Sequence, residues 1–190
     1  MTIVKIFFLI VLLTILAAGL FIGSGAYNIA ANVPHWPVTT KLLEIVRERS
    51  IEVRSEDLPP APKTSPEMLS EAAEGYAEMC VQCHLAPGVE ETELYQGLYP
   101  KPPVFYKEQG EEHDEKEMFW VIKNGIKLTA MPSWGAVHTD EQMWALVRFL
   151  EKLPDMSPQE YRGLTAEDAT HTSEERGHSD GHKSEGGHHH

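Results

Sequence analysis

The chain has 190 residues, which leaves room for one globular domain of roughly 100–150 residues and some smaller segments. Its formal net charge of −13 argues against nucleic-acid binding through phosphate contacts and favours basic partners. Only two cysteines are present, separated by two residues, so a framework of disulfides is excluded.

An apolar segment opens the chain. No charged side chain occurs from Ile6 to Val33, and the first part of this stretch is almost purely Ile, Leu, Val, Phe and Ala. A helix of about 20 such residues spans the core of a bilayer. Residues 1–33 are therefore predicted to form a single-pass transmembrane anchor.

The orientation of this anchor is predicted from the positive charges around it. Lys5 precedes the apolar segment and the next positive charge is Lys41, so the N-terminus is expected in the cytoplasm. The chain after Val33 would then lie outside the inner membrane, in the periplasm. A signal peptide cleaved near Ser24-Gly25-Ala26 is the alternative, but the apolar run is longer than the hydrophobic region of a usual signal peptide.

Residues 34–65 are predicted to hold a juxtamembrane helix and a proline-rich linker. Thr39 or Thr40 can cap a helix over residues 41–50, in which Leu42, Ile45 and Val46 recur at helical spacing. This helix either packs on the domain after it or docks on a membrane surface or a partner. The prolines from residue 55 to 65 indicate a semi-rigid linker.

A compact domain is predicted over residues 66–155, and its first helix begins at Pro66. Ser65 is the expected cap, and proline is favoured at the first position of a helix. Gly75 costs about 1 kcal/mol in a helix interior, so close packing is expected there. The predicted core stripe of this helix consists of Leu69, Ala72, Tyr76 and Met79.

Two further helices complete the domain. One begins at about Asp114, with Glu117 as its capping-box partner, and ends at Gly125. The other begins at Thr139, with Gln142 as the partner, and ends before a proline. No segment alternates as a strand does, so the fold class is predicted to be all-α. Three short helices make a thin core, which a large apolar insert would stabilise.

The C-x-x-C-H motif at Cys80, Cys83 and His84 is typical of covalent haem attachment. Two thiols at this spacing can each add to one vinyl group of the porphyrin, and the adjacent histidine can then bind the iron. A thioredoxin-like redox pair would need a βαβ context, and a structural zinc site would need four ligands. Neither is apparent, so the motif predicts one haem c with His84 as the proximal ligand.

Met131 is the predicted second ligand to the iron. It lies in a loop between the second and third helices, and Pro132 stiffens that loop. His138 is the alternative and would give a lower reduction potential. The other nearby candidates are Met79, Met118, Met143 and His113, of which the three methionines fall at core spacing.

Residues 156–190 lose the hydrophobic pattern and are predicted to be a disordered tail. The tail holds six histidines: His171, His178, His182, His188, His189 and His190. Such a tract could bind copper, nickel or zinc, which leaves a metal-handling role open.

These motifs together resemble the class I cytochromes c, in their short single-haem bacterial form. The resemblance covers about residues 66–154 and rests on Gly75-Tyr76, the C-x-x-C-H motif, Met131-Pro132 and the aromatic residues Trp144 and Phe149 of the last helix. It implies that the first and last helices cross, with Gly75 against the Trp144–Phe149 region. One departure is Leu85, where the family often has glycine.

The resemblance also implies further site residues. In the family a backbone carbonyl of a proline-containing loop holds the proximal histidine, and here Pro102 or Pro103 is the candidate. Such a bond fixes the orientation of the ring and tunes its basicity. Trp134 is expected either to donate its indole N–H to a haem propionate or to fill the core.

The expected function is single-electron transfer by a membrane-anchored protein that is not itself an enzyme. Between residues 66 and 154 there are seven Lys and Arg against 16 Asp and Glu, so redox partners with a basic docking patch are expected. A haem subunit of a membrane oxidoreductase complex is the alternative, and the helix at residues 41–50 would then be its docking element.

Overall fold

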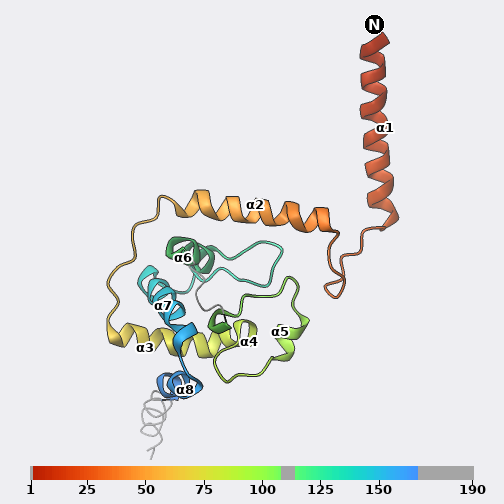
Figure 1. The fold of residues 1–190 in the computed structure, drawn as a ribbon. Helices are drawn as coiled ribbons and strands as arrows, with labels where there is room; N and C mark the ends of the chain where they lie inside the picture. Colours follow the sequence, from red (N-terminus) through yellow and green to blue (C-terminus); the bar gives the residue numbers. More distant parts are fainter. Residues whose placement is uncertain (1, 108–113, 167–190) are drawn as a thin grey trace, which may run out of the picture. The chain divides into compact units, whose positions relative to one another are not determined.

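The computed structural model describes residues 2–107 and 114–166, and within these ranges every regular element is a helix (Figure 1). The predicted all-α fold is confirmed. The chain divides into two compact units, Met1–Ile45 and Val46–His190. The division falls inside helix α2 (Pro37–Ser55). It lies between residue 33, where the anchor was predicted to end, and residue 65, where the linker was predicted to end.

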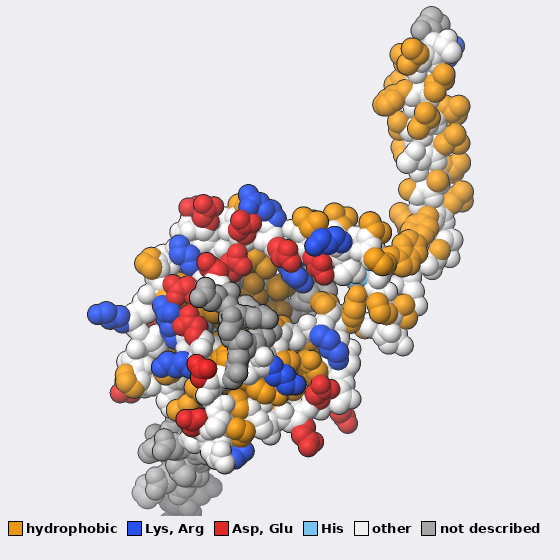
Figure 2. Space-filling view, in the orientation of Figure 1, with side chains coloured by type: hydrophobic (Ala, Val, Ile, Leu, Met, Phe, Trp, Pro, Cys, Tyr) orange, Lys and Arg blue, Asp and Glu red, His pale blue; other side chains and the backbone are white. Residues whose placement is uncertain are grey.

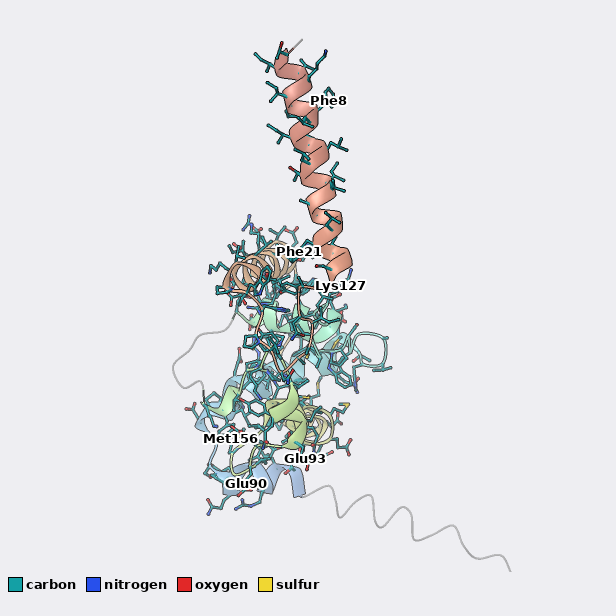
Figure 3. The ribbon with its side chains drawn as sticks, turned by 90° about the vertical axis from the view of Figure 1, so that its right-hand side faces the viewer. Phe8, Phe21, Glu90, Glu93, Lys127 and Met156 are labelled. Carbon is teal, nitrogen blue, oxygen red and sulfur yellow. The ribbon has the colours of Figure 1, made fainter. Side chains whose placement is uncertain are left out.

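Helix α1 (Thr2–Ser24) is long and apolar enough to cross a membrane. Its 23 residues correspond to about 35 Å of helix, against a hydrocarbon core of about 30 Å. None of its side chains is buried; Phe8 projects outward, and apolar side chains cover the helix (Figures 2 and 3). These properties fit the predicted membrane anchor.

An aromatic cluster lies after α1 within the same unit. The ring of Trp36 lies 5.9 Å from that of Phe21 and 5.1 Å from that of Tyr27, measured between centroids. The hydroxyl of Tyr27 is 2.8 Å from Nδ1 of His35. Tryptophan and tyrosine are favoured where a membrane meets water, so the cluster suits the end of a membrane span.

Helix α2 begins earlier than predicted and is longer. Its first residue is Pro37, and the N–H of Thr40 donates to the carbonyl of Trp36 at 3.0 Å. The expected cap at Thr39 or Thr40 is therefore wrong. Proline has a backbone dihedral that suits the first position of a helix and lacks an N–H that would be left unpaired there, which explains the earlier start.

Helices α3, α6 and α7 form the core of the second unit. Helix α3 packs on α7, as does α6, so the predicted crossing of the first and last helices is confirmed. The rings of Tyr76 and Phe149 lie 5.4 Å apart, and those of Phe119 and Trp144 stack at 4.2 Å. The helical segments of this unit after α2 are α3 (Pro66–Gly75), a π-helix (Tyr76–Cys80), α4 (Val81–His84), α5 (Glu93–Gly97), a 3₁₀-helix (Phe105–Lys107), α6 (Glu115–Asn124), α7 (Asp140–Lys152), a second 3₁₀-helix (Leu153–Asp155) and α8 (Pro158–Ala166).

The predicted N-terminal caps of these three helices are confirmed. The hydroxyl of Ser65 accepts a bond from the N–H of Met68 at 3.3 Å, at the start of α3. Asp114 accepts bonds from two backbone N–H groups at the start of α6. Thr139 and Gln142 form the reciprocal bonds of a capping box at α7. The caps satisfy backbone donors that have no partner within the helix.

The expected role of Gly75 is wrong. A Cβ atom at this position would touch only the Cε of Met79, at 3.4 Å, which is an ordinary contact. Ala73 of α3 and Tyr76, the first residue of the π-helix, are fully buried, and the ring of Tyr76 lies against that of Phe149 in α7. The aromatic ring of Tyr76 makes the contact with α7 that was expected of the glycine.

Two segments expected to lie outside the domain pack on it. Leu58 and Ala61, in the proline-rich stretch, contact the core. Helix α8 packs on α3 and buries Tyr161, so the disorder predicted from residue 156 is wrong over Pro158–Ala166. Because one aromatic side chain carries most of this contact, the hydrophobic pattern of the segment is too sparse to indicate a helix. The histidines of the tail, from His171 to His190, lie outside the described residues.

Candidate haem site

The C-x-x-C-H motif lies at the end of one continuous helical run made of α3, the π-helix and α4. The N–H of Val81 bonds to the carbonyl of Tyr76, five residues earlier, which defines the π-turn. Such a turn holds one more residue than an α-turn and rotates the residues after it by about 100°. Cys80, Cys83 and His84 line the same cavity as a result.

The ring of His84 is held from two sides. Its Nδ1 lies 2.9 Å from the carbonyl oxygen of Pro103, so of the two candidate prolines Pro103 provides the contact. A carbonyl only accepts, so Nδ1 is the protonated nitrogen and Nε2 keeps its lone pair for a metal ion. The ring also stacks on Phe105, with 5.1 Å between centroids.

Helix α5 fastens the proline loop beside the motif. Thr92 caps α5 and donates its hydroxyl to the carbonyl of Gln82 at 2.5 Å, which ties α5 to α4. Lys101 donates to the carbonyls of Tyr95 and Gln96, at 2.6 and 2.8 Å, at the end of α5. The loop that carries Pro103 is thus attached to the segment that carries His84.

Leu85, which stands where the family often has glycine, has a left-handed backbone with φ of 57°. Its side chain is fully buried, and its carbonyl accepts a bond of 2.6 Å from the hydroxyl of Tyr76. A positive φ combined with ψ near 180° is a conformation that glycine adopts almost alone, and it costs a residue with a Cβ atom about 1–3 kcal/mol. Burial of the leucine offsets this cost, so the departure from glycine changes local packing and strain and leaves the motif intact.

The loop that carries Met131 turns back across the end of α6. Gly125 ends the helix with φ of 67°, and a Cβ atom there would lie 2.8 Å from the carbonyl oxygen of Met131. Only glycine permits this approach. The backbone of Met131 accepts from the N–H of Ile126 at 3.2 Å and donates to the hydroxyl of Thr129 at 3.1 Å.

The last carbonyls of α6 hold the second half of this loop. The backbone N–H of Trp134 donates to the carbonyl of Ile122 at 3.1 Å, and that of Gly135 donates to the carbonyl of Lys123 at 3.0 Å. The hydroxyl of Ser133 also donates to Lys123, at 2.8 Å. Carbonyls at a helix end have no partner within the helix, so the loop satisfies them while they fix its path.

The predicted site residues surround one cavity of about 690 Å³, a volume typical of cofactor pockets. Its wall is mainly apolar and carries the side chains of Cys80, Cys83, His84 and Met131. A flat apolar group with a metal centre fits this combination. Every predicted site residue lies on this wall: Cys80, Cys83, His84, Pro102, Pro103, Met131 and Trp134. Met79 and Met118 also line it, whereas His138 and Met143 line a separate cavity of about 120 Å³. His113 lies outside the described residues.

The two thiols are free, and burial raises the pKa of the Cys80 thiol to about 12, with Cys83 adding to the shift. Burial also raises the pKa of Cys83. Within residues 2–107 and 114–166, no three His, Cys, Asp or Glu side chains cluster as a metal site would require.

Three of the lining residues that the sequence did not indicate matter most for the site. Phe105 stacks on His84, and its place directly after the proline loop was a usable signal. Arg47 and Ile51 come from α2 and line the cavity far from the motif in sequence. No sequence signal pointed to these two, because nothing local relates a helix to a cavity formed by other elements.

Residues 67–150 match the family described as cytochrome C oxidase, cbb3-type, subunit III. The matched segment contains the motif, the proline loop and the Met131 loop. No curated protein matches the chain. Residues 67–150 are thus a cytochrome c domain, which implies a c-type cytochrome that binds haem c and transfers electrons.

Proposed function

We propose that this protein is a membrane-anchored, single-haem electron carrier of the periplasmic face of the inner membrane. The observation that supports it best is the single cavity lined by Cys80, Cys83, His84 and Met131. One haem c would be attached through the two cysteines. His84 and Met131 would be its axial ligands, and closed coordination of this kind suits electron transfer better than chemistry on a bound substrate.

The residues around the cavity have distinct tasks in this proposal. When bound, the haem supplies an iron that alternates between Fe(III) and Fe(II). The carbonyl of Pro103 accepts a hydrogen bond from the Nδ1–H of His84, which leaves the lone pair of Nε2 to bind the iron. The Met131 loop presents the thioether, and the apolar wall excludes water. Pro102 lines the same wall, and Trp134 would donate its indole N–H to a propionate.

Two measurements on the purified protein test this assignment. Haem that survives denaturation and acid extraction establishes covalent attachment. Met131→Ala is expected to abolish the Fe(III)–sulfur charge-transfer band, whereas Met118→Ala, which alters another methionine of the cavity wall, retains it. Persistence of the band in Met131→Ala would rule out Met131 as the ligand.

Topology is tested separately. The positive charge of Lys5, near the start of α1, and the need to attach haem outside the cytoplasm both favour a periplasmic cytochrome domain. A reporter active only in the periplasm, fused after residue 166, is expected to be active. A fusion before α1 is expected to be inactive, and the reverse result would overturn the orientation.

A haem subunit of a membrane oxidoreductase complex is the second candidate. Its support is the matched family, whose description names a subunit of an oxidase. The first half of α2 also exposes Val38, Leu42 and Ile45 on one face, which could contact a neighbouring subunit. Purification in mild detergent separates the candidates: a monomer supports the carrier, and stoichiometric subunits support the complex.

The histidine-rich tail is a third possibility that lies outside the described residues. Removal of residues 170–190 tests it. If metal binding and metal tolerance are unchanged, the tail has no metal-handling role.

A further inference from the structure

The second half of α2 forms part of the wall of the haem cavity. Arg47 and Ile51 line it, together with Asp114 and Glu117 of α6. Both α2 residues precede the segment matched by the cytochrome family, which begins at residue 67. A cytochrome domain limited to residues 67–150 would lack this wall.

Several contacts hold this half of α2 in place. Ser55, at its end, is 3% exposed, and Leu58 packs on the core just beyond it. Lys116 of α6 donates to the carbonyl of Glu56 at 2.9 Å. These contacts fix the end of the helix on the domain. The face that carries Arg47 and Ile51 is therefore held against the cavity.

Carboxylates gather at the edge of the cavity that α2 shares with the start of α6. Asp114 and Glu117 line the cavity, and the α2 carboxylates Glu48 and Glu52 lie near Glu117. Burial first, and then these three carboxylates, raise the pKa of Glu117. Carboxylates from two helices therefore face each other at this edge, and a further anion bound there needs a cation beside it.

Two cations line the cavity among its described residues, Arg47 and Lys101. Lys101 already donates to two carbonyls at the end of α5. Arg47 is 3.5 Å from Glu48, and this contact is exposed to solvent, so it is weak. The guanidinium has five donors in a planar fork and can bind a second carboxylate in addition.

We propose that Arg47 binds a propionate carboxylate of the haem and that Ile51, one turn later, covers the same edge of the porphyrin. This rests on the proposed function, because the haem supplies the carboxylate. A guanidinium pairs with a carboxylate through two parallel hydrogen bonds, which gives both strength and orientation. The second half of α2 then forms part of the cofactor site, although it lies outside the segment that matches the cytochrome family.

Two matched pairs of variants in the full-length, haem-loaded protein test the proposal. Arg49 is two residues from Arg47, which places it about 200° around the helix; it is exposed and pairs with Glu52 at 2.7 Å. Arg47→Gln is expected to lower the midpoint potential, because a cation beside the haem favours Fe(II). Arg47→Lys is expected to lower it less, and Arg49→Gln to leave it unchanged at an ionic strength that screens remote charges.

Ile51 and Val53 form the second pair, again on opposite faces of α2. Ile51→Ala is expected to speed reduction by a small water-soluble reductant and Val53→Ala to have no effect. Equal shifts in Arg47→Gln and Arg49→Gln, or none in either, overturn the proposal. Absence of covalent haem in the unmodified protein overturns the proposed function instead, so the two failures are distinguishable.

Discussion

Leu85 combines a left-handed backbone with a fully buried side chain. Leu85→Ala would keep the strain and lose the buried surface, at a cost of about 2–5 kcal/mol in the free energy of unfolding. Leu85→Gly loses the same surface but relieves about 1–3 kcal/mol of strain. Chemical denaturation of the haem-loaded protein is expected to rank the stabilities as wild type, then Leu85→Gly, then Leu85→Ala.

This order is the opposite of that within a helix, where glycine is less stable than alanine, and it follows from the positive φ of Leu85 at the end of α4. If Leu85→Gly proves less stable than Leu85→Ala, the backbone at this position is not strained.

Tyr161 makes the stability of the domain depend on alkaline pH. Burial, and to a smaller extent Cys80, raise its pKa to about 12 from an ordinary value of 10. The folded state therefore holds the proton where the unfolded state has released it, so the stabilising contribution is complete below pH 10 and is lost as the pH rises toward 12. The stability of the wild type is expected to fall more steeply over this window than that of Tyr161→Phe.

The same pair of proteins should show equal slopes between pH 7 and 9, where Tyr161 does not titrate in either state. The hydroxyl of Tyr161 has no hydrogen-bond partner among the described residues, so its removal should not itself be destabilising.

Among the elements, the π-helix changed most strongly which side chains face the core, and α-helical spacing could not anticipate this change. The stripe Leu69, Ala72, Tyr76 and Met79 assumes 3.6 residues per turn, but Met79 is 37% exposed. The additional residue of the π-turn rotates the chain after Tyr76, so that Met79 leaves the core and Cys80 turns toward the cavity. Sequence periodicity carries no signal for such a turn, because it arises from the packing around it.

Helix α8 leads to a prediction about truncation. A chain that ends after Met156 lacks the buried ring of Tyr161, and loss of a large buried aromatic side chain costs about 3–5 kcal/mol. Thermal unfolding of the haem-loaded protein is expected at a clearly lower temperature than for a chain that ends after Ala166. Identical melting of the two would show that α8 does not stabilise the domain.

The elements that could be predicted are those with local signals. Ser65, Asp114 and Thr139 cap helices through bonds to residues two or three positions away, so their sequence context suffices. The cysteines and His84 were equally evident, because the motif is contiguous. The contacts of α2 and α8 depend on surfaces formed by distant segments, and no local pattern records which surface a helix covers.

At the scale of the molecule, charge should govern encounters with partners. The domain carries more than twice as many acidic as basic residues between positions 66 and 154. Electron transfer to a basic redox protein is expected to slow as ionic strength rises, because salt screens the attraction over about 10 Å at 0.1 M. Stopped-flow rates with a basic and an acidic partner test this, since the acidic partner should show no such decrease.

The clamped Met131 loop has a consequence for the speed of electron transfer. Both proposed ligands are held by hydrogen bonds, His84 through its ring Nδ1 and the carbonyl of Pro103, and Met131 through backbone bonds within its loop and from the loop to the end of α6. An electron that reaches the iron changes its charge, and every ligand or solvent dipole that must then move adds to the reorganisation energy of the step. A frame that holds both ligands in one geometry, within a largely apolar wall, keeps that energy small. In the proposed carrier, rigidity of the loop is thus a kinetic property as well as a structural one.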